Sequence, residues 1–142
     1  MFGPSFFNVY GVGQRPESPY GGVVSIFADR NLRGEPLNIY GDGSQSRDFA
    51  HVDDAVQAVL AALARTSTPG LVCSIGTGVQ TSIVRLAKML SHTMRPSAIP
   101  IFLAARVGDI SRSVADATLA KHLLDYEAKV EFRAGLKTLV VS

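Results

Sequence analysis

The chain has 142 residues, 46% of them hydrophobic and 18% charged, which suits one folded domain and excludes disorder by composition. A formal net charge of +2 with no Lys/Arg-rich run argues against nucleic acid as a partner, and no apolar run reaches the roughly 18 residues of a membrane-spanning helix. The single cysteine, Cys73, excludes an internal disulfide and, in its apolar run, is interpreted as a buried small hydrophobe. We therefore expect a cytoplasmic protein with neither a nucleic-acid nor a membrane partner.

The N-terminal residues predict a strand, a loop and a helix. Residues 6–10 are apolar and are followed by a Gly-x-Gly turn, which is typical of a short strand. Ser18 followed by Pro19 is typical of a helix start, so we predict a helix from there to Gly34.

The segment from Ile39 to Asp54 is the most informative part of the chain. A strand over 37–40 leads into a turn with glycine at 41 and 43, and a second strand is predicted over 49–52. We interpret the segment as a hairpin that presents Arg47 beside a glycine-rich turn, where backbone can approach a ligand.

The remaining elements alternate between helix and strand. A helix is predicted over 53–65 with one apolar stripe: Val52, Val56, Val59, Leu60 and Leu63. A turn over 66–70, a buried strand over 71–75, a helix from Ser82 to Pro96 and a strand over 99–103 follow. We then expect an irregular segment over 105–115, a short helix capped by Asp116, and a helix within 132–140. This alternation indicates an α/β fold.

The residues alone give only modest chemical signals. No His, Cys or carboxylate set has the spacing of metal ligands, and His51 is interpreted as a structural residue or a residue at the rim of a site. Arg47 and Arg106 lie in polar loops between ordered elements, and a guanidinium suits phosphate oxygens. Asp109 could accept hydrogen bonds from sugar hydroxyls. From local chemistry alone, solvated charges or surface ion pairs explain the two arginines better than anion binding does.

The order of short motifs resembles one known family. The motifs are Phe7-Asn8-Val9-Tyr10-Gly11, Ser18-Pro19, Gly34-Glu35-Pro36-Leu37, the 41–54 stretch, Ile75-Gly76-Thr77-Gly78 and Gly108-Asp109. Nearly the whole chain resembles the C-terminal, substrate-binding half of an extended short-chain dehydrogenase/reductase of the NAD-dependent epimerase/dehydratase family. The closest pattern is that of UDP-sugar 4-epimerases. The resemblance implies one α/β domain over 1–142 in which strands 6–10 and 71–75 and helix 53–65 derive from a Rossmann sheet that the chain lacks.

The resemblance also implies which residues bind a UDP-sugar. Seven positions match the family pattern: Asn8, Leu37, Asn38, Tyr40, Arg47, Arg106 and Asp109. It implies that Asn8 contacts the diphosphate-sugar, that the strand over 37–40 holds uracil, and that Arg47 binds the diphosphate. Arg106 and Asp109 match a pair that binds phosphate and ribose.

Two features of the family are absent from these residues. The chain has no Gly-x-Gly-x-x-Gly loop, and none of its four tyrosines is followed four residues later by a lysine. In similar enzymes NAD takes up and returns the hydride while a Tyr-x-x-x-Lys pair moves the proton. We therefore expect no cofactor bound by this chain alone and no catalytic residue in it. Asp125 also stands where relatives end a helix with glycine, which should cost helix-end stability.

Several functions stay open on these grounds. The first is a truncated homologue of a UDP-hexose 4-epimerase that is inactive alone. The second is a module that binds a UDP-sugar or related nucleotide without turnover, and the third is an oligomerising protein with a vestigial site. Because the missing strands would leave apolar surface uncovered, we also expect a homo-oligomer or an N-terminal partner chain.

Overall fold

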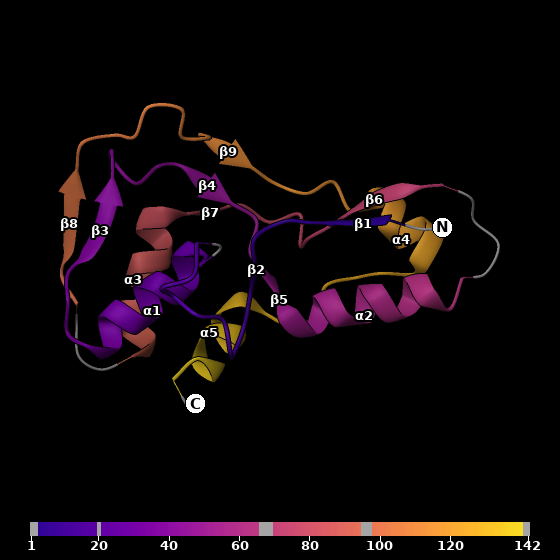
Figure 1. Ribbon diagram of the computed structural model, residues 1–142, viewed down its shortest axis with the longest axis horizontal. Coiled ribbons are helices and arrows are strands. Elements are labelled where there is room, and N and C mark those ends of the chain that lie inside the picture. The colour runs from indigo at the N-terminus through magenta and orange to yellow at the C-terminus, as the bar shows by residue number, and fades with distance from the viewer. Residues whose placement is uncertain (1–2, 20, 66–69, 95–97, 141–142) are drawn as a thin grey trace.

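The computed structural model describes residues 3–19, 21–65, 70–94 and 98–140. Its helices are α1 (Val23–Leu32), α2 (Val52–Leu63), α3 (Ile83–Thr93), α4 (Thr118–Leu124) and α5 (Phe132–Thr138). Its strands are β1 (Gly3–Phe6), β2 (Val9–Tyr10), β3 (Leu37–Tyr40), β4 (Ser46–Arg47), β5 (Ala50–His51), β6 (Val72–Ile75), β7 (Thr81–Ser82), β8 (Pro100–Leu103) and β9 (Arg112–Ser113). Figure 1 shows β3, β8, α1 and α3 at one end of an elongated molecule, and β1, β6, α2 and α4 at the other.

The strands form small, mostly parallel sheets. β1 pairs with β6, β2 with β5 and β3 with β8, each in parallel. The central strand of the three-stranded sheet, β4, runs antiparallel to β7 and parallel to β9. Parallel strands joined through helices are the mark of the α/β class, so the expected class is confirmed.

The hairpin expected over 39–54 is wrong. β3 pairs with β8, and the chain then turns at Gly41 and Gly43, both of which have positive φ angles of 70° and 76°. The backbone amides of Ile83 and Val84 donate to the carbonyls of Gln45 and Gly43, which ties this turn to the start of α3. The second predicted strand therefore does not pair with β3. It corresponds to β5, which pairs with β2.

Two N-terminal expectations also need correction. The strand expected over 6–10 is split into β1 and β2, which pair with different partners. The first helix begins at Val23 instead of near Ser18, because the Gly21 amide closes a turn on the Ser18 carbonyl and Gly22 is extended. Gly34, with φ +68°, follows its last turn as expected.

The strongly periodic helices match their predictions closely. α2 begins one residue before the expected start, and α3 begins after the Ser82 hydroxyl, which accepts the Arg85 amide as an N-cap. Pro96 and most of the turn expected over 66–70 lie outside the described residues. The segment expected to be irregular contains β9, and the Asp116 carboxylate accepts the Thr118 amide at the start of α4.

The core has two clusters, one at each end of the molecule. The larger joins α1, β3, α3 and α5 and includes Leu37, Ile39, Leu86 and Leu136. The smaller joins β6 and α4 and includes Cys73, so the expectation that this thiol is buried is confirmed.

The apolar stripe of α2 faces outward. Val56 is 48% exposed, Leu60 is 53% exposed and Leu63 is 74% exposed, whereas the small residues Ala55 and Ala58 are buried. Among the described residues, no helix is long and apolar enough to span a membrane.

Candidate functional site

The site lies in a cavity of about 470 Å³ beside β3. Six of the seven residues that the sequence nominates line it: Asn8, Asn38, Tyr40, Arg47, Arg106 and Asp109. They come from segments far apart in the chain, namely the β1–β2 connection, β3, β4 and the loop after β8. Leu37 does not line the cavity, because its side chain is fully buried and its amide donates to the Ile99 carbonyl.

The outer edge of β3 supplies backbone donors and acceptors. Leu37 and Gly41 donate to the carbonyls of Ile99 and Leu103. Because alternate residues of a parallel strand bond to opposite sides, the backbone groups of Asn38 and Tyr40 point away from β8. No second strand pairs with that edge among the described residues. The edge can therefore bind a flat group that carries both donors and acceptors.

A cation stacks on the aromatic ring at the end of β3. The Arg106 guanidinium carbon lies 3.7 Å from the centroid of the Tyr40 ring. This cation–π contact holds the exposed loop of residues 104–111 against β3. Figure 1 shows this loop running from β8 to β9 along one side of the molecule.

A second cation is held inside the site. The Nη2 atom of Arg47 lies 2.8 Å from Oδ1 of Asp109, and Nη1 donates to the carbonyls of Ser46 and Ile110. The Arg47 side chain is only 16% exposed, so its orientation is well defined. The geometry thus brings Arg47, Arg106 and Asp109 together, which the sequence alone could not show.

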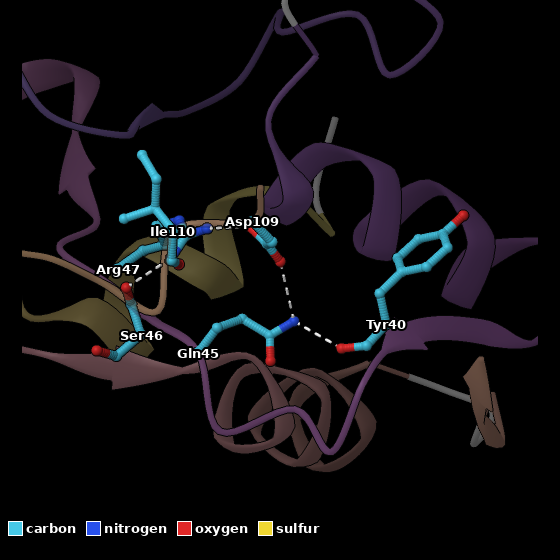
Figure 2. Close-up of polar contacts among 6 residues, drawn as sticks. All are labelled: Tyr40, Gln45, Ser46, Arg47, Asp109 and Ile110. Atoms are coloured by element: carbon cyan, nitrogen blue, oxygen red, sulfur yellow. Dashed lines mark hydrogen bonds and ion pairs between the residues drawn. The ribbon is translucent and has the colours of Figure 1, made fainter. Parts of the chain in front are cut away.

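Gln45 is a site residue that the sequence reasoning missed. Its Nε2 atom lies 2.7 Å from the Tyr40 carbonyl and 3.4 Å from Oδ2 of Asp109 (Figure 2). The turn before it is further ordered by Asp42, whose carboxylate accepts the Ser44 amide. Hydrogen bonds from the side chain and backbone of Ser44 lower the pKa of Asp42 and keep it ionised.

A buried carboxylate, that of Asp48, stabilises the backbone next to the site. Asp48 is fully buried and accepts hydrogen bonds from four donors: the Thr77 amide, the Thr77 hydroxyl, the Gly78 amide and the Ala115 amide. The Asn8 side chain donates to the Asp48 carbonyl at 3.3 Å. These contacts fix the backbone next to Arg47, so Asp48 positions the cation without reaching the cavity.

His51 has the structural role expected from the sequence. It is 5% exposed, and its Nδ1 atom accepts the Asp53 amide at the start of α2. Its ring packs edge-on against Tyr10, with the centroids 5.3 Å apart. Burial, together with Asp54 and Glu131, raises the pKa of Tyr10.

The described residues contain neither a complete dinucleotide-binding glycine motif nor a cluster of metal ligands. Three Gly-x-Gly turns occur, over 11–13, 41–43 and 76–78, but none has the third glycine or leads directly into a helix. The amides of the third turn are already occupied by Asp48. No cluster of metal ligands is found in the described part of the chain.

Comparison with known proteins gives a consistent result. The model of the NAD-dependent epimerase/dehydratase family matches residues 3–76. A UDP-glucose 4-epimerase of Mycolicibacterium smegmatis is 36% identical over 133 residues, which is 94% of this chain and 42% of that protein. UDP-glucuronic acid decarboxylase 2 of Arabidopsis thaliana is 35% identical over 94% of this chain and 29% of its own length.

Solved structures of similar proteins superpose on nearly the whole chain. The Thermotoga maritima UDP-glucose 4-epimerase with UDP-glucose gives a TM-score of 0.91 at 39% identity, over 99% of this chain and 44% of that one. MoeE5 in complex with UDP-glucuronic acid and NAD gives a TM-score of 0.89 at 35% identity, over 99% of this chain and 46% of that one. The chain thus spans less than half of the proteins that it matches. The expectation of an α/β fold corresponding to part of an epimerase is confirmed.

Proposed function

This chain belongs to the NAD-dependent epimerase/dehydratase family, and from that membership we propose that it binds a UDP-hexose through the nucleotide. The seven residues proposed to bind it are Asn8, Leu37, Asn38, Tyr40, Arg47, Arg106 and Asp109. We place Leu37 in this set only as the start of the strand that carries Asn38 and Tyr40, because its own side chain belongs to the core.

The convergence of Arg47, Arg106 and Asp109 on one cavity is the observation that carries this proposal. Two guanidinium groups offer planar sets of donors that suit the oxygens of a diphosphate. The Asp109 carboxylate is 33% exposed and has acceptor capacity beyond its ion pair, which suits ribose hydroxyls. A lone surface ion pair would not need a second arginine or a cavity.

The open edge of β3 supports a uracil base. Uracil presents an N–H donor between two carbonyl acceptors, which matches the amide and carbonyl of Asn38 and the amide of Tyr40, whereas the Tyr40 carbonyl already accepts from Gln45. Because Arg106 already covers the Tyr40 ring at 3.7 Å, we propose that the base lies along the strand edge. A base at that edge would not occupy the part of the cavity that Arg47 and Arg106 line, so the phosphates can lie beside the two guanidinium groups.

We further propose that this chain alone does not catalyse epimerisation. The proposal is supported by the lack of a Gly-x-Gly-x-x-Gly loop and of a Tyr-x-x-x-Lys pair in the 142 residues, and by the Thr77 amide, which already donates to Asp48. The relatives that carry NAD in their solved structures are more than twice as long as the matched region. The reaction of the family, 4-epimerisation of a UDP-hexose, would then require residues from outside this chain.

The exposed side of α2 favours a second proposal about assembly. Val56, Leu60 and Leu63 form an uncharged stripe at the same end of the molecule as Phe6 and Val72, which are also exposed. We propose that an N-terminal partner chain or a second copy covers this surface, and that β1, β2, β6 and α2 belong to the parent Rossmann sheet. If the cavity binds nothing, this surface favours a structural, oligomerising protein instead.

Two measurements test these proposals. Calorimetric titration with UDP and UDP-glucose should show binding of both, with most of the affinity supplied by UDP. No binding of either would overturn the proposed ligand and favour the structural alternative. Incubation of the purified chain with UDP-glucose and NAD should yield no UDP-galactose, and measurable turnover would show that the chain is a complete enzyme. We also propose a cytoplasmic location, in keeping with the free thiol of Cys73.

A further inference from the structure

We propose that Gln45 is a positioning residue of the nucleotide site, which holds the Asp109 carboxylate in place while Arg47 binds phosphate. This inference rests on the proposed function and adds to it a residue that the family pattern did not nominate. The relevant geometry is one side-chain amide that lies between a strand end and a loop (Figure 2).

The backbone of Gln45 is fixed before its side chain is considered. Its carbonyl accepts the Ile83 amide at 3.0 Å, at the start of α3, and Gly43 accepts the Val84 amide at the same distance. Glycine is required at position 43, because a Cβ there would lie 2.9 Å from Ile39 and φ is +76°. The Gln45 side chain therefore extends into the cavity from a rigid turn.

The orientation of the Gln45 amide is set by its two neighbours. Both the Tyr40 carbonyl and the Asp109 carboxylate can only accept hydrogen bonds, so the nitrogen of the amide must face them. An NH₂ group carries two hydrogens and can serve both acceptors. Gln45 thus links the end of β3 to the loop of residues 104–111.

Asp109 is held from two sides by different residues. Oδ1 pairs with Arg47 at 2.8 Å, and Oδ2 accepts from Gln45 at 3.4 Å. If Arg47 turns to the diphosphate of a ligand, its ion pair with Asp109 is weakened. Gln45 is then the side chain that still orients the carboxylate toward ribose hydroxyls.

The loop that carries Asp109 needs a hydrogen bond such as the one from Gln45 to hold it in place. Residues 104–111 are all exposed, and Gly108 has a φ of +80° with no atom within 4 Å of a Cβ added there. Among the described residues, apart from the strand pairing at its two ends, the loop is held over the cavity by contacts with Tyr40, Gln45 and Arg47. Once Arg47 turns to a phosphate, loss of the Gln45 amide would leave the Asp109 carboxylate without either of these two side-chain contacts.

The test uses Gln45→Met, which keeps the length and volume of the side chain and removes the donor. We expect UDP to bind about tenfold more weakly to this variant, because a hydrogen bond to a charged group is lost. Gln45→Glu places a second carboxylate against Asp109 and should bind still more weakly. Gln57→Met, on the exposed side of α2, is the matched control and should bind like the wild type.

A double-mutant cycle with Asp109→Ala separates positioning from packing. If Gln45 acts through Asp109, the double variant Gln45→Met/Asp109→Ala should bind UDP about as weakly as Asp109→Ala alone. Additive losses, or wild-type affinity in Gln45→Met, would overturn the inference. Absence of UDP binding by the wild type would overturn both proposals, whereas loss of binding in Arg47→Ala beside normal binding in Gln45→Met would overturn this one alone.

Discussion

Asp48 and Thr77 are joined by both the backbone and the side chain of the threonine: the Thr77 amide and hydroxyl donate to Oδ1 of Asp48 at 2.9 and 2.6 Å. The carboxylate has no cation beside it among the described residues, and it is satisfied instead by neutral donors. A buried charge is costly unless such donors surround it. This pair therefore depends on all of the donors to the Asp48 carboxylate being in place.

We expect Asp48→Asn to lower the free energy of unfolding by about 3 kcal/mol, because an amide replaces one acceptor with a donor among buried N–H groups. Urea denaturation followed by circular dichroism measures the change. Asp125→Asn, at an exposed position where asparagine tolerates the left-handed conformation, is the matched control and should have little effect. Equal stabilities of the Asp48 variant and the wild type would contradict this reading of the pair.

Arg47→Ala should weaken UDP binding by about 1.5–3 kcal/mol, which is about 10- to 150-fold, because a charge-assisted contact to phosphate is lost. Arg47→Lys keeps the charge without the planar fork and should bind with intermediate affinity. Calorimetric titration gives both values. The control is Arg33→Ala, which removes an exposed arginine at the C-terminal end of α1 that forms an ion pair with Asp29, away from the cavity. Similar losses in the Arg33 and Arg47 variants would remove the support for a phosphate contact.

Replacing Asp125 by glycine should stabilise the protein by about 0.5–1 kcal/mol. Asp125 is the one non-glycine residue with positive φ in the described part of the chain, at φ 56°, and it ends α4. Thermal denaturation would show a higher midpoint for Asp125→Gly. Ala64→Gly, at the end of α2 where φ is −71°, should instead lower the midpoint. A lower midpoint for Asp125→Gly would mean that its left-handed conformation carries no strain.

The buried hydroxyl of Tyr126 makes stability fall at high pH. Burial, reinforced by the negative charges of Asp54 and Asp48, raises the pKa of Tyr126 to about 12. An unfolded tyrosine ionises near pH 10, so the folded state binds this proton more tightly. The contribution of protonated Tyr126 to the free energy of unfolding is fully present below about pH 10 and is lost as pH rises toward about 12. Tyr126→Phe should therefore reduce the alkaline slope of the urea midpoint, and an unchanged slope would contradict this assignment.

The stripe on α2 should drive association of the isolated chain. Leu60→Glu combined with Leu63→Glu places charges on an exposed apolar surface, so it should lower the apparent mass in light scattering at a given concentration. Little change in stability is expected, because both side chains are already exposed. Leu32→Glu is the control, because Leu32 is an exposed residue of α1, a helix at the other end of the molecule. A wild-type chain that is a monomer at all concentrations would count against the proposal that a second copy covers the exposed stripe of α2.

The sequence predicted local elements better than their partners. α2 and α3 were placed within a few residues because their apolar period and caps are local signals. The pairing of β3 could not be predicted, because α2, α3 and several strands separate it from its partner β8 along the chain. A glycine-rich turn between two apolar runs indicated a hairpin, but β3 pairs with β8, and Leu37 and Ile39 are fully buried in this arrangement.

The candidate site shows the same division. Arg47, Arg106 and Asp109 could be nominated because charged residues in polar loops stand out, and family motifs added Asn8 and the strand residues Asn38 and Tyr40. Gln45 carried no such signal, because an uncharged side chain reveals its role only through partners, one of which is 64 residues away. The role of Asp48 could not be predicted for a related reason, because its partners include backbone amides of other segments.

The parallel pairing of short strands has a consequence for how the chain acquires its structure. Gly3 pairs with Val72 and Leu37 with Pro100, so each sheet must close a long loop before its first hydrogen bond forms. Such a high contact order predicts refolding in milliseconds to seconds rather than microseconds, which stopped-flow fluorescence or circular dichroism can measure. During that time the helices can form early, while the strand edges remain open to neighbouring chains. A partner that is present during synthesis would shorten this exposure.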